Sequence, residues 1–387
     1  GPAAGGCRRW TYASDDMALT DVLRLSRGMT YKNAVAGLPF GGGKSVILSR
    51  DGTPKSDELL EAFGRAVQSL EGRYITAEDV GMSVDDMRVV HTQTEYVSGL
   101  PKSGDNAGGD PSPITALGVF LGIEAAVEAR LGLTSLDGVT VAVQGVGHVG
   151  ANLCRLLHEA GARLLVADVS RANLRSVCAA LPAEVVSPKD VLFSDVDVLA
   201  PCALGNVLNS ETIPRIRAKV IAGAANNQLA TSADGERLTE RGILYAPDYV
   251  INAGGIINVS HEYFGDSSED AVREDLARIP ERLRDLFAEA ESSGRPTNVL
   301  ADELARRIVE QRIPPVHHRM PRKSRRQRDI VQGVRGHRLE CKAVASRDAG
   351  HTPGGCDKGD GAHGSGTRDE RWRHREPGRS RKSMAGE

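Results

Sequence analysis

One segment, residues 138–168, restricts the fold of the chain more than any other. VTVAVQ is short and fully apolar, as expected of a buried strand, and GVGHVG follows it directly. ANLCRLLHEAG then has the pattern of a helix, and ARLLVAD that of a second strand ending at Asp168. A strand, a crossover helix and a second strand in this order form a βαβ unit, so we expect a parallel sheet.

The turn after the first strand has the spacing G-x-G-x-x-G, with Gly145, Gly147 and Gly150. The first glycine permits the tight turn, the second lets a pyrophosphate approach the backbone, and the third lets the helix pack on the strand. A glycine-rich turn without a nucleotide is the alternative. Asp168 argues against it, because a carboxylate at this distance accepts from the ribose 2′-hydroxyl and repels a 2′-phosphate. The unit predicts NAD, and Arg171 leaves NADP open.

Further apolar runs begin at residues 197, 219 and 243, with helical segments between them. This alternation predicts a doubly wound parallel sheet of the Rossmann type. Asn226, Asn227 and Asn252 lie at the ends of these runs, at the edge where an open parallel sheet binds its ligand.

The N-terminal part contains the segment GMTYKNAVAGLPFGGGK, residues 28–44, in which a turn and three glycines separate two lysines. Val22, Leu25, Met29 and Lys32 are spaced so that all four share one face of a helix. Lys32 therefore lies on the apolar stripe, either as a functional group or as a lysine extending past the helix end. Lys44 follows the glycines, which are used where backbone must approach another group closely.

A second pair of candidate groups lies at residues 73–80, RYITAEDV, which we expect to form a strand ending in two carboxylates, Glu78 and Asp79. We expect helices at residues 56–70 and 84–97, then a loop or hinge at 102–113 and a helix at 114–131. These patterns divide the chain into an N-terminal substrate domain (1–100), a Rossmann domain (101–295), a helix returning to the first domain (296–313) and a tail (314–387).

The charge of the chain is unevenly distributed. Residues 314–387 contain 18 Lys and Arg against 9 Asp and Glu, which leaves 31 against 42 for the preceding part. The tail has no sustained periodicity and few aliphatic residues, so we expect it to be disordered. It lacks the repeated aromatics of a nucleic-acid-binding segment, and out-of-frame translation of a GC-rich gene would explain its composition. The six cysteines show no metal or disulfide spacing, and no apolar run is long enough for a membrane span, so we expect a cytoplasmic protein without a metal site.

Beyond these patterns, the chain resembles the amino-acid dehydrogenases that act on glutamate, leucine, phenylalanine and valine, and the leucine and valine enzymes most closely. The resemblance extends from the N-terminus to about residue 313. The matching segments are GPAAGG, RGMTYKNAVAGLPFGGGKSVI, GRYITAEDVG, GDPSPITALGV, VQGVGHVG, APCALG, AGAANNQL and GILYAPDYVINAGGIINV.

The resemblance implies a reversible reaction in which an L-amino acid, NAD and water give the 2-oxo acid, ammonia and NADH. It implies that Lys32 holds the substrate carboxylate, that Lys44 activates the attacking water, and that Asp79 relays protons to and from the amino group. Asn227 and Thr115 match positions on the cofactor side. These roles agree with general chemistry, because a buried carboxylate needs a cation and a lysine base needs a lowered pKa.

The resemblance also implies which residues line the substrate pocket. They are apolar, which argues against a glutamate side chain and favours leucine or valine. Phenylalanine is the alternative, because one of them is smaller than the leucine usual in the leucine and valine enzymes. The matching positions are Ala4, Gly5, Ala77, Ile256 and Val259.

Two departures from the family pattern lead to further expectations. A helix and strands that precede GPAAGG in the family are not found ahead of it here, so the first domain is expected to be truncated. A catalytically impaired nucleotide-binding relative is therefore a further alternative. The tail is foreign to the family. We expect a homo-oligomer, with small-molecule substrates and without nucleic acid or membrane as partners.

Overall fold

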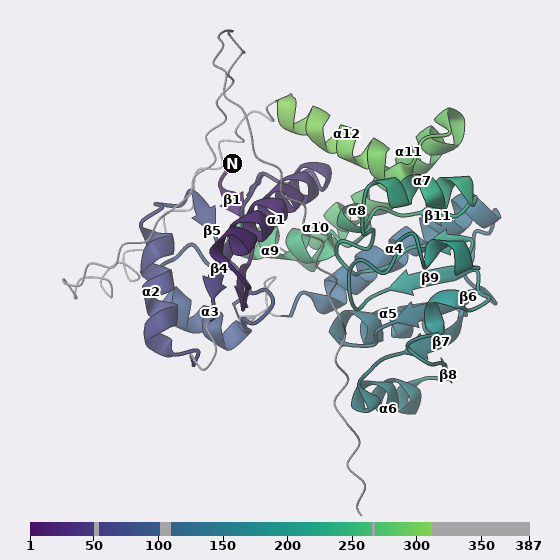
Figure 1. Cartoon of the computed structure of the whole chain (residues 1–387), viewed down its shortest axis with the longest axis horizontal. Helices are drawn as coiled ribbons and strands as arrows, with labels where there is room; N and C mark the ends of the chain where they lie inside the picture. Colours follow the sequence, from purple (N-terminus) through teal and green to yellow (C-terminus); the bar gives the residue numbers. More distant parts are fainter. Residues whose placement is uncertain (50–53, 101–109, 265–267, 312–387) are drawn as a thin grey trace, which may run out of the picture. The chain divides into compact units, whose positions relative to one another are not determined.

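The computed structural model describes residues 1–49, 54–100, 110–264 and 268–311 (Figure 1). The tail for which the sequence predicts disorder lies outside the described residues. So does most of the expected loop at residues 102–113. The boundaries that we placed at residues 100 and 295 stay predictions.

A six-stranded parallel sheet forms the larger half of the chain and confirms the predicted Rossmann-type fold (Figure 1). In the order β11-β10-β9-β6-β7-β8, the strand that comes first in the sequence, β6, lies at the centre. β7 and β8 follow on one side of it and β9 to β11 on the other, which is the arrangement of dinucleotide-binding sheets. The strands are β6 (Thr140–Gln144), β7 (Arg163–Ala167), β8 (Glu184–Val185), β9 (Val198–Pro201), β10 (Val220–Ile221) and β11 (Leu244–Tyr245).

Alternate residues of these strands enter two different hydrophobic cores. Val141 and Val143 of β6 belong to a core with the helices α4 (Ser112–Leu131), α5 (His148–Glu159) and α6 (Arg171–Ala180). Ala142, between them, belongs to a second core under α7 (Ala233–Glu240) and two 3-10 turns. Both faces of β6 are covered, so its central residues are apolar, as the sequence predicts. The 3-10 turns are η1 (Val191–Phe193) and η2 (Ile213–Arg215).

The N-terminal part contains short parallel strands in a group of three and a group of two. β1 (Ala3–Ala4) lies between β3 (Gly41–Gly42) and β5 (Tyr74–Ile75), and β2 (Cys7–Trp10) pairs with β4 (Ser45–Leu48). This pairing brings the chain before Gly6, the glycine run and the segment after β5 side by side.

Three helices accompany these strands, each begun by a serine that accepts a backbone N–H. Ser14 caps α1 (Asp15–Val35), Ser56 caps α2 (Asp57–Gln68) and Ser83 caps α3 (Val84–His91) in a capping box with Asp86. α1 contains the predicted helical face from Val22 to Lys32, and Lys32 lies in its last turn.

Two local predictions in this region were wrong in extent. The strand expected at residues 73–80 is regular only over β5, so Glu78 and Asp79 lie in the segment beyond it. The helix expected at residues 84–97 ends at His91, whose ring Nδ1 contacts the Thr94 carbonyl. Residues 96–98 instead exchange backbone hydrogen bonds with Thr76 and extend the pairing at β5. Strand-like pairing overrides the helical pattern there, and Val97 enters the first-domain core.

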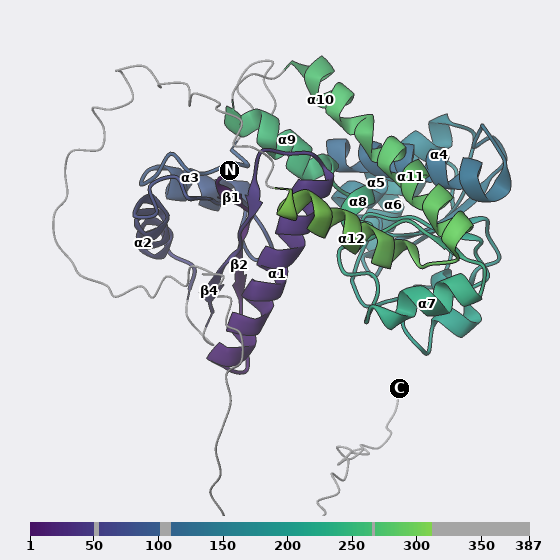
Figure 2. The ribbon, with the colours of Figure 1, turned by 90° about the horizontal axis from the view of Figure 1, so that it is seen from above.

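The last helices return toward the N-terminal strands. They are α8 (Asp248–Ile251), α9 (Gly254–Phe264), α10 (Glu269–Leu276), α11 (Arg278–Ser293) and α12 (Thr297–Glu310). Arg306 of α12 donates to the Tyr31 hydroxyl of α1 at 3.1 Å, and Figure 2 shows the two helices side by side.

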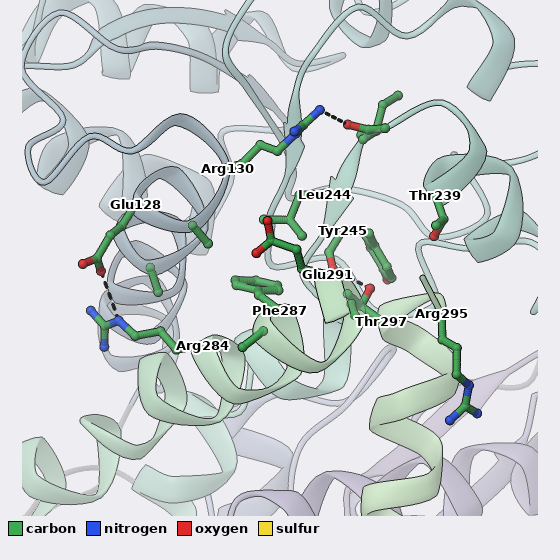
Figure 3. Close-up of a pocket in the computed structure, with 16 residues that line it drawn as sticks. Glu128, Arg130, Thr239, Leu244, Tyr245, Arg284, Phe287, Glu291, Arg295 and Thr297 are labelled. Carbon is green, nitrogen blue, oxygen red and sulfur yellow. Dashed lines mark hydrogen bonds and ion pairs between the residues drawn. The ribbon is translucent and has the colours of Figure 1, made fainter. Parts of the chain in front are cut away.

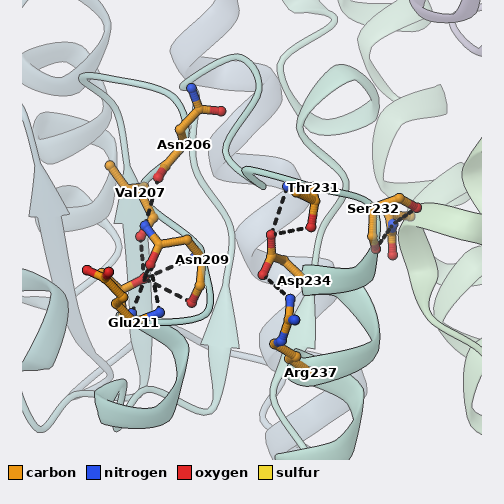
Figure 4. A network of polar contacts seen from close by, with 10 residues as sticks. Asn206, Val207, Asn209, Glu211, Thr231, Ser232, Asp234 and Arg237 are labelled. Carbon is orange, nitrogen blue, oxygen red and sulfur yellow. Dashed lines mark hydrogen bonds and ion pairs between the residues drawn. The ribbon is translucent and has the colours of Figure 1, made fainter. Parts of the chain in front are cut away.

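Polar networks hold the loops that follow β9 and β10 (Figure 4). The Asn209 side chain accepts the backbone N–H groups of Glu211 and Thr212 at 2.9 and 3.0 Å. Asp234 accepts the Thr231 hydroxyl at 2.8 Å and pairs with Arg237 at 2.7 Å. These contacts stabilise loops whose other ends lie at the carboxyl edge of the sheet, where a ligand is expected.

Candidate active site

Lys44 and Asp79 form an ion pair at the end of the glycine run. Lys44 Nζ lies 3.0 Å from Asp79 Oδ1, and only 7% of the lysine side chain is exposed. Arg8 Nε donates to the other carboxylate oxygen, Oδ2, at 3.0 Å. Both oxygens of Asp79 are therefore paired with cations. The sequence analysis missed Arg8, because it is the register of β2 with β4, Arg8 opposite Val46, that brings it to Asp79.

The charges around Asp79 set its protonation state. Burial alone would raise the pKa of the Asp79 carboxyl, but Lys44 and Arg8 outweigh it and hold that pKa below its usual value. Arg8 is itself shared, because its Nη1 pairs with Asp21 at 3.2 Å. The carboxylate is thus ionised at neutral pH. It can accept a proton only when Lys44 or Arg8 no longer pairs with it.

The glycine run permits this close assembly. A Cβ on Gly42 would lie 2.1 Å from the backbone nitrogen of Thr30 in α1, and a Cβ on Gly5 would lie 1.9 Å from the Gly43 carbonyl oxygen. Strand and helix backbones therefore touch at positions where no side chain fits. This contact brings Lys32, two residues after Thr30, to the same end of the strands as Lys44.

Lys32 is the second lysine of the site, half-buried in the last turn of α1. Burial lowers the pKa of its amine to about 8; Asp248 acts in the opposite direction, and Lys44 lowers it further. Lys32 Nζ donates to Asn226 Oδ1 at 3.1 Å. The amine remains mainly protonated at neutral pH, as a group that binds a carboxylate must be.

Lys32 contacts Asn226, the neighbour of the asparagine that the resemblance places on the cofactor side. Asn226 contacts the lysine, and the buried Asn252 fixes it by donating to Asn226 Oδ1 at 2.8 Å and to the Ala224 carbonyl at 3.0 Å. Asn227 is exposed, with a positive φ of 52° that asparagine tolerates, and its carbonyl accepts from Asn206 at 2.6 Å. The role of Asn227 toward the cofactor stays a prediction.

The residues expected to line the substrate pocket come from two parts of the chain. Ile256 and Val259 are half-buried on α9, with the intervening Ile257 and Asn258 directed into the protein. Ala77 is half-buried in the segment between β5 and Asp79. Two further residues, Ala4 and Gly5, lie at the end of β1, and Ala4 is 1% exposed and forms part of the core.

The three glycines of the nucleotide loop have three different surroundings. Gly145 has a φ of 92°, and Gly150 lies where a Cβ would be 2.0 Å from the Gly145 carbonyl oxygen. A Cβ on Gly147 would meet no atom within 4 Å, and Gly147 begins α5 without a side-chain cap. Space beside an uncapped helix N-terminus is the arrangement that binds a pyrophosphate, so the loop fits a dinucleotide.

Asp168 follows β7 beside this loop. Its Oδ2 accepts the Val146 N–H at 2.9 Å, and its Oδ1 accepts the Ser170 N–H at 2.7 Å. Burial acts to raise the pKa of the Asp168 carboxyl, but these backbone donors outweigh it and lower that pKa. Thr115, at the start of α4, donates its hydroxyl to the Pro111 carbonyl at 2.9 Å, and its Oγ1 faces Gly255 of α9.

A cavity of about 360 Å³ lies away from all these residues, between α4, α7, β11 and α11 (Figure 3). Its walls include the Glu128–Arg284 ion pair at 3.1 Å and the hydrogen bond from Arg130 to the Gly242 carbonyl at 2.6 Å. None of the predicted site residues borders it.

Comparison with known proteins agrees with this geometry. The family model "Glu/Leu/Phe/Val dehydrogenase, dimerisation domain" matches residues 1–96, and "Glutamate/Leucine/Phenylalanine/Valine dehydrogenase" matches residues 110–176 and 169–305. The chain belongs to the Glu/Leu/Phe/Val dehydrogenase family. Members of this family use a nicotinamide nucleotide, which the surroundings of Gly147 can accommodate.

Individual members of the family are similar over most of their length. Leucine dehydrogenase of Bacillus subtilis (strain 168) is 49% identical over 80% of this chain and 85% of its own. L-tryptophan dehydrogenase of Nostoc punctiforme is 49% identical over 81% and 86%. The crystal structure of L-tryptophan dehydrogenase from Nostoc punctiforme superposes with a TM-score of 0.70 at 48% identity, covering 80% of this chain and 89% of that chain.

Proposed function

We propose that this protein catalyses the reversible, NAD-dependent oxidative deamination of a branched-chain L-amino acid, leucine or valine, to its 2-oxo acid and ammonia. The ion pair between Lys44 and Asp79, with Lys32 at the same end of the strands, carries the proposal. Relatives named leucine dehydrogenase at 45–49% identity support the substrate class.

The roles of the three groups follow from their charges. Lys32 pairs its ammonium with the substrate carboxylate, which places the Cα–N bond at the site. Lys44 accepts the proton of the water that attacks the imine carbon, and Asp79 exchanges protons with the amino group. The path for a proton between Lys44 and Asp79 is short, because Lys44 Nζ and Asp79 Oδ1 are 3.0 Å apart.

The cofactor, when bound, supplies the acceptor for the substrate hydride. The chain contributes the loop with Gly147, the uncapped start of α5 and Asp168 to hold it. NAD rather than NADP is supported by the ionised Asp168 carboxylate, which would repel a 2′-phosphate.

Aromatic amino acids are a second candidate class of substrate. The 49% identity to L-tryptophan dehydrogenase favours it, and so does the small side chain of Ala4 in the expected pocket. One methylene distinguishes apolar substrates by only about 1–3 kcal/mol, so pocket size has to be measured by kinetics.

The experiment is a screen of L-amino acids with NAD, followed by NADH absorbance. Leucine or valine with the highest kcat/KM supports the proposal. A phenylalanine or tryptophan value well above both supports the second candidate, and NAD binding without NADH formation from any amino acid supports a catalytically impaired relative.

Assembly and location complete the proposal. A homo-oligomer is supported by the dimerisation-domain match and by exposed apolar side chains there: Trp10 52%, Met17 56%, Leu23 47% and Leu48 41%. Light scattering on the purified protein tests it. The described cysteines are free, which fits the cytoplasm, and no described helix is long and apolar enough to cross a membrane.

A further inference from the structure

Glu262, near the end of α9, binds the first domain with both carboxylate oxygens. Oε2 accepts the Gly99 N–H at 3.0 Å and Oε1 accepts the Leu100 N–H at 2.9 Å. Gly99 has a φ of 79°, which favours glycine and turns two successive N–H groups toward one anion. No role in the reaction described above uses this carboxylate.

The segment that Glu262 holds is hydrogen-bonded in turn to the residue that follows β5. Ser98, next to Gly99, donates its N–H to the Thr76 carbonyl at 2.8 Å, and Thr76 donates to the Tyr96 carbonyl at 3.0 Å. Thr76 is fully buried and directly precedes Ala77. A short backbone path therefore leads from Glu262 to one expected wall of the substrate pocket and on to Asp79.

The other expected wall of the pocket lies on the same helix as Glu262. Val259 and Ile256 precede it by three and six residues, so the three side chains lie on neighbouring parts of one helical face. A second contact fixes the same end of α9, because the Phe264 ring stacks on Phe40 with 5.2 Å between ring centroids. Phe40 directly precedes the glycine run that leads to Lys44.

We propose that Glu262 is a specificity-determining positioning residue, whose bidentate contact sets the distance between the Val259 wall and the Ala77 wall of the pocket. The inference rests on the proposed function. A carboxylate suits this task because it accepts two N–H donors at once, and such charge-assisted bonds are shorter and stronger than neutral ones. The amino acid that fits is then decided by a residue that does not touch it.

Replacement of Glu262 by glutamine tests the proposal. Glutamine can accept only one of the two N–H groups, because its amide nitrogen faces the other. We expect the ratio of kcat/KM for leucine to that for phenylalanine to change at least about tenfold, the size of a pocket effect, with the KM for NAD unchanged. Glu262→Asp keeps the charge on a shorter arm, draws α9 inward, and should shift preference toward valine.

The matched control is Glu274→Gln on α10, an exposed position with the same change of charge and no hydrogen bond or ion pair among the described residues. It should keep the wild-type ratio. An unchanged ratio in Glu262→Gln, or an equal loss on every substrate, would overturn the proposal, since a purely structural role lowers all rates together.

Hydrogen exchange gives a readout that does not depend on turnover. The Gly99 and Leu100 amides should exchange faster in Glu262→Gln than in wild type, and equal exchange would refute the contact itself. A wild-type protein that deaminates no amino acid refutes the proposed function and the specificity role with it, whereas the exchange rates still decide whether Glu262 holds the two segments together.

Discussion

Lys44 Nζ lies 3.0 Å from Asp79 Oδ1, and the lysine side chain is almost entirely buried. A buried ammonium is stable only when paired, and here its partner is shared with Arg8. Asp79 therefore has two cationic partners, Lys44 on one carboxylate oxygen and Arg8 on the other.

Lys44→Ala should abolish turnover and leave NAD binding intact. Loss of a general base costs about 10²–10⁴-fold in rate, and the nucleotide loop is formed by other residues. Rates with saturating NAD and leucine, and NAD affinity by fluorescence titration, provide the measurement. Turnover near the wild-type value in this variant would contradict the assignment of Lys44 as the base.

Lys32→Ala should mainly raise the KM for the amino acid, because the carboxylate contact is made in the ground state and transition state alike. Lys55→Ala is the matched control, since Lys55 lies in the same part of the chain and contacts Asp86 and the Gly81 carbonyl rather than a residue of the site. It should leave KM unchanged. A Lys32 variant with normal KM and lowered kcat would argue for a role in the chemical step.

The lowered pKa of Lys32, about 8, predicts an alkaline limb in kcat/KM. The free enzyme loses the ammonium as pH rises through that value, and the substrate carboxylate then meets a neutral amine. In the complex the carboxylate holds the proton on Lys32, so kcat should decline only at higher pH. Profiles of kcat/KM and kcat from pH 7 to 10 test this, and coincident alkaline limbs would contradict it.

The same shift has a consequence for stability. The pKa of Lys32 is lower in the folded chain than its ordinary value of 10.5, so the unfolded chain binds more protons between about pH 8 and 10.5. The free energy of unfolding therefore gains a contribution from Lys32 that increases with pH over this window. Urea titrations of wild type and Lys32→Met should diverge there, and parallel curves would show that the amine is not buried in solution.

Asp168→Asn should weaken discrimination against NADP. The replacement removes the charge that repels a 2′-phosphate, and Arg171 lies nearby to attract it. The ratio of kcat/KM for NAD to that for NADP is expected to fall at least about tenfold. Because Asp168 also accepts the Val146 N–H, thermal unfolding must accompany the kinetics; an unchanged ratio in a stable variant would contradict the role.

The sequence predicted the fold correctly because several features of each unit indicated the same structure. The unit at residues 138–168 specified strand, helix and strand at once, and all three are present in the structure. Residue pairs across the fold were harder. Arg8 reaches Asp79 only because β2 pairs in register with β4, which no local pattern determines. Asn226 and Asn227 are adjacent residues of the same type, so the sequence alone does not say which of them contacts Lys32. The backbone conformation decides it, and Asn226 is the one that faces Lys32.

Gly147 allows the cofactor loop to be tested without disturbing the fold. A methyl group at this position meets no atom within 4 Å, so Gly147→Ala should unfold at about the wild-type Tm. Its free energy of unfolding should change by no more than that of one exposed substitution, about 0.5 kcal/mol. The methyl group occupies the space at the start of α5 that a pyrophosphate needs, so NAD affinity should fall at least about tenfold.

Gly150→Ala is the matched counterpart in the same loop, since its methyl group would lie 2.0 Å from the Gly145 carbonyl oxygen. This variant should unfold at a lower temperature and lose NAD binding as a result. The contrast separates a position kept open for a ligand from one closed by packing. Equal NAD affinity in wild type and Gly147→Ala would show that the pyrophosphate lies elsewhere, whatever the stability of Gly150→Ala.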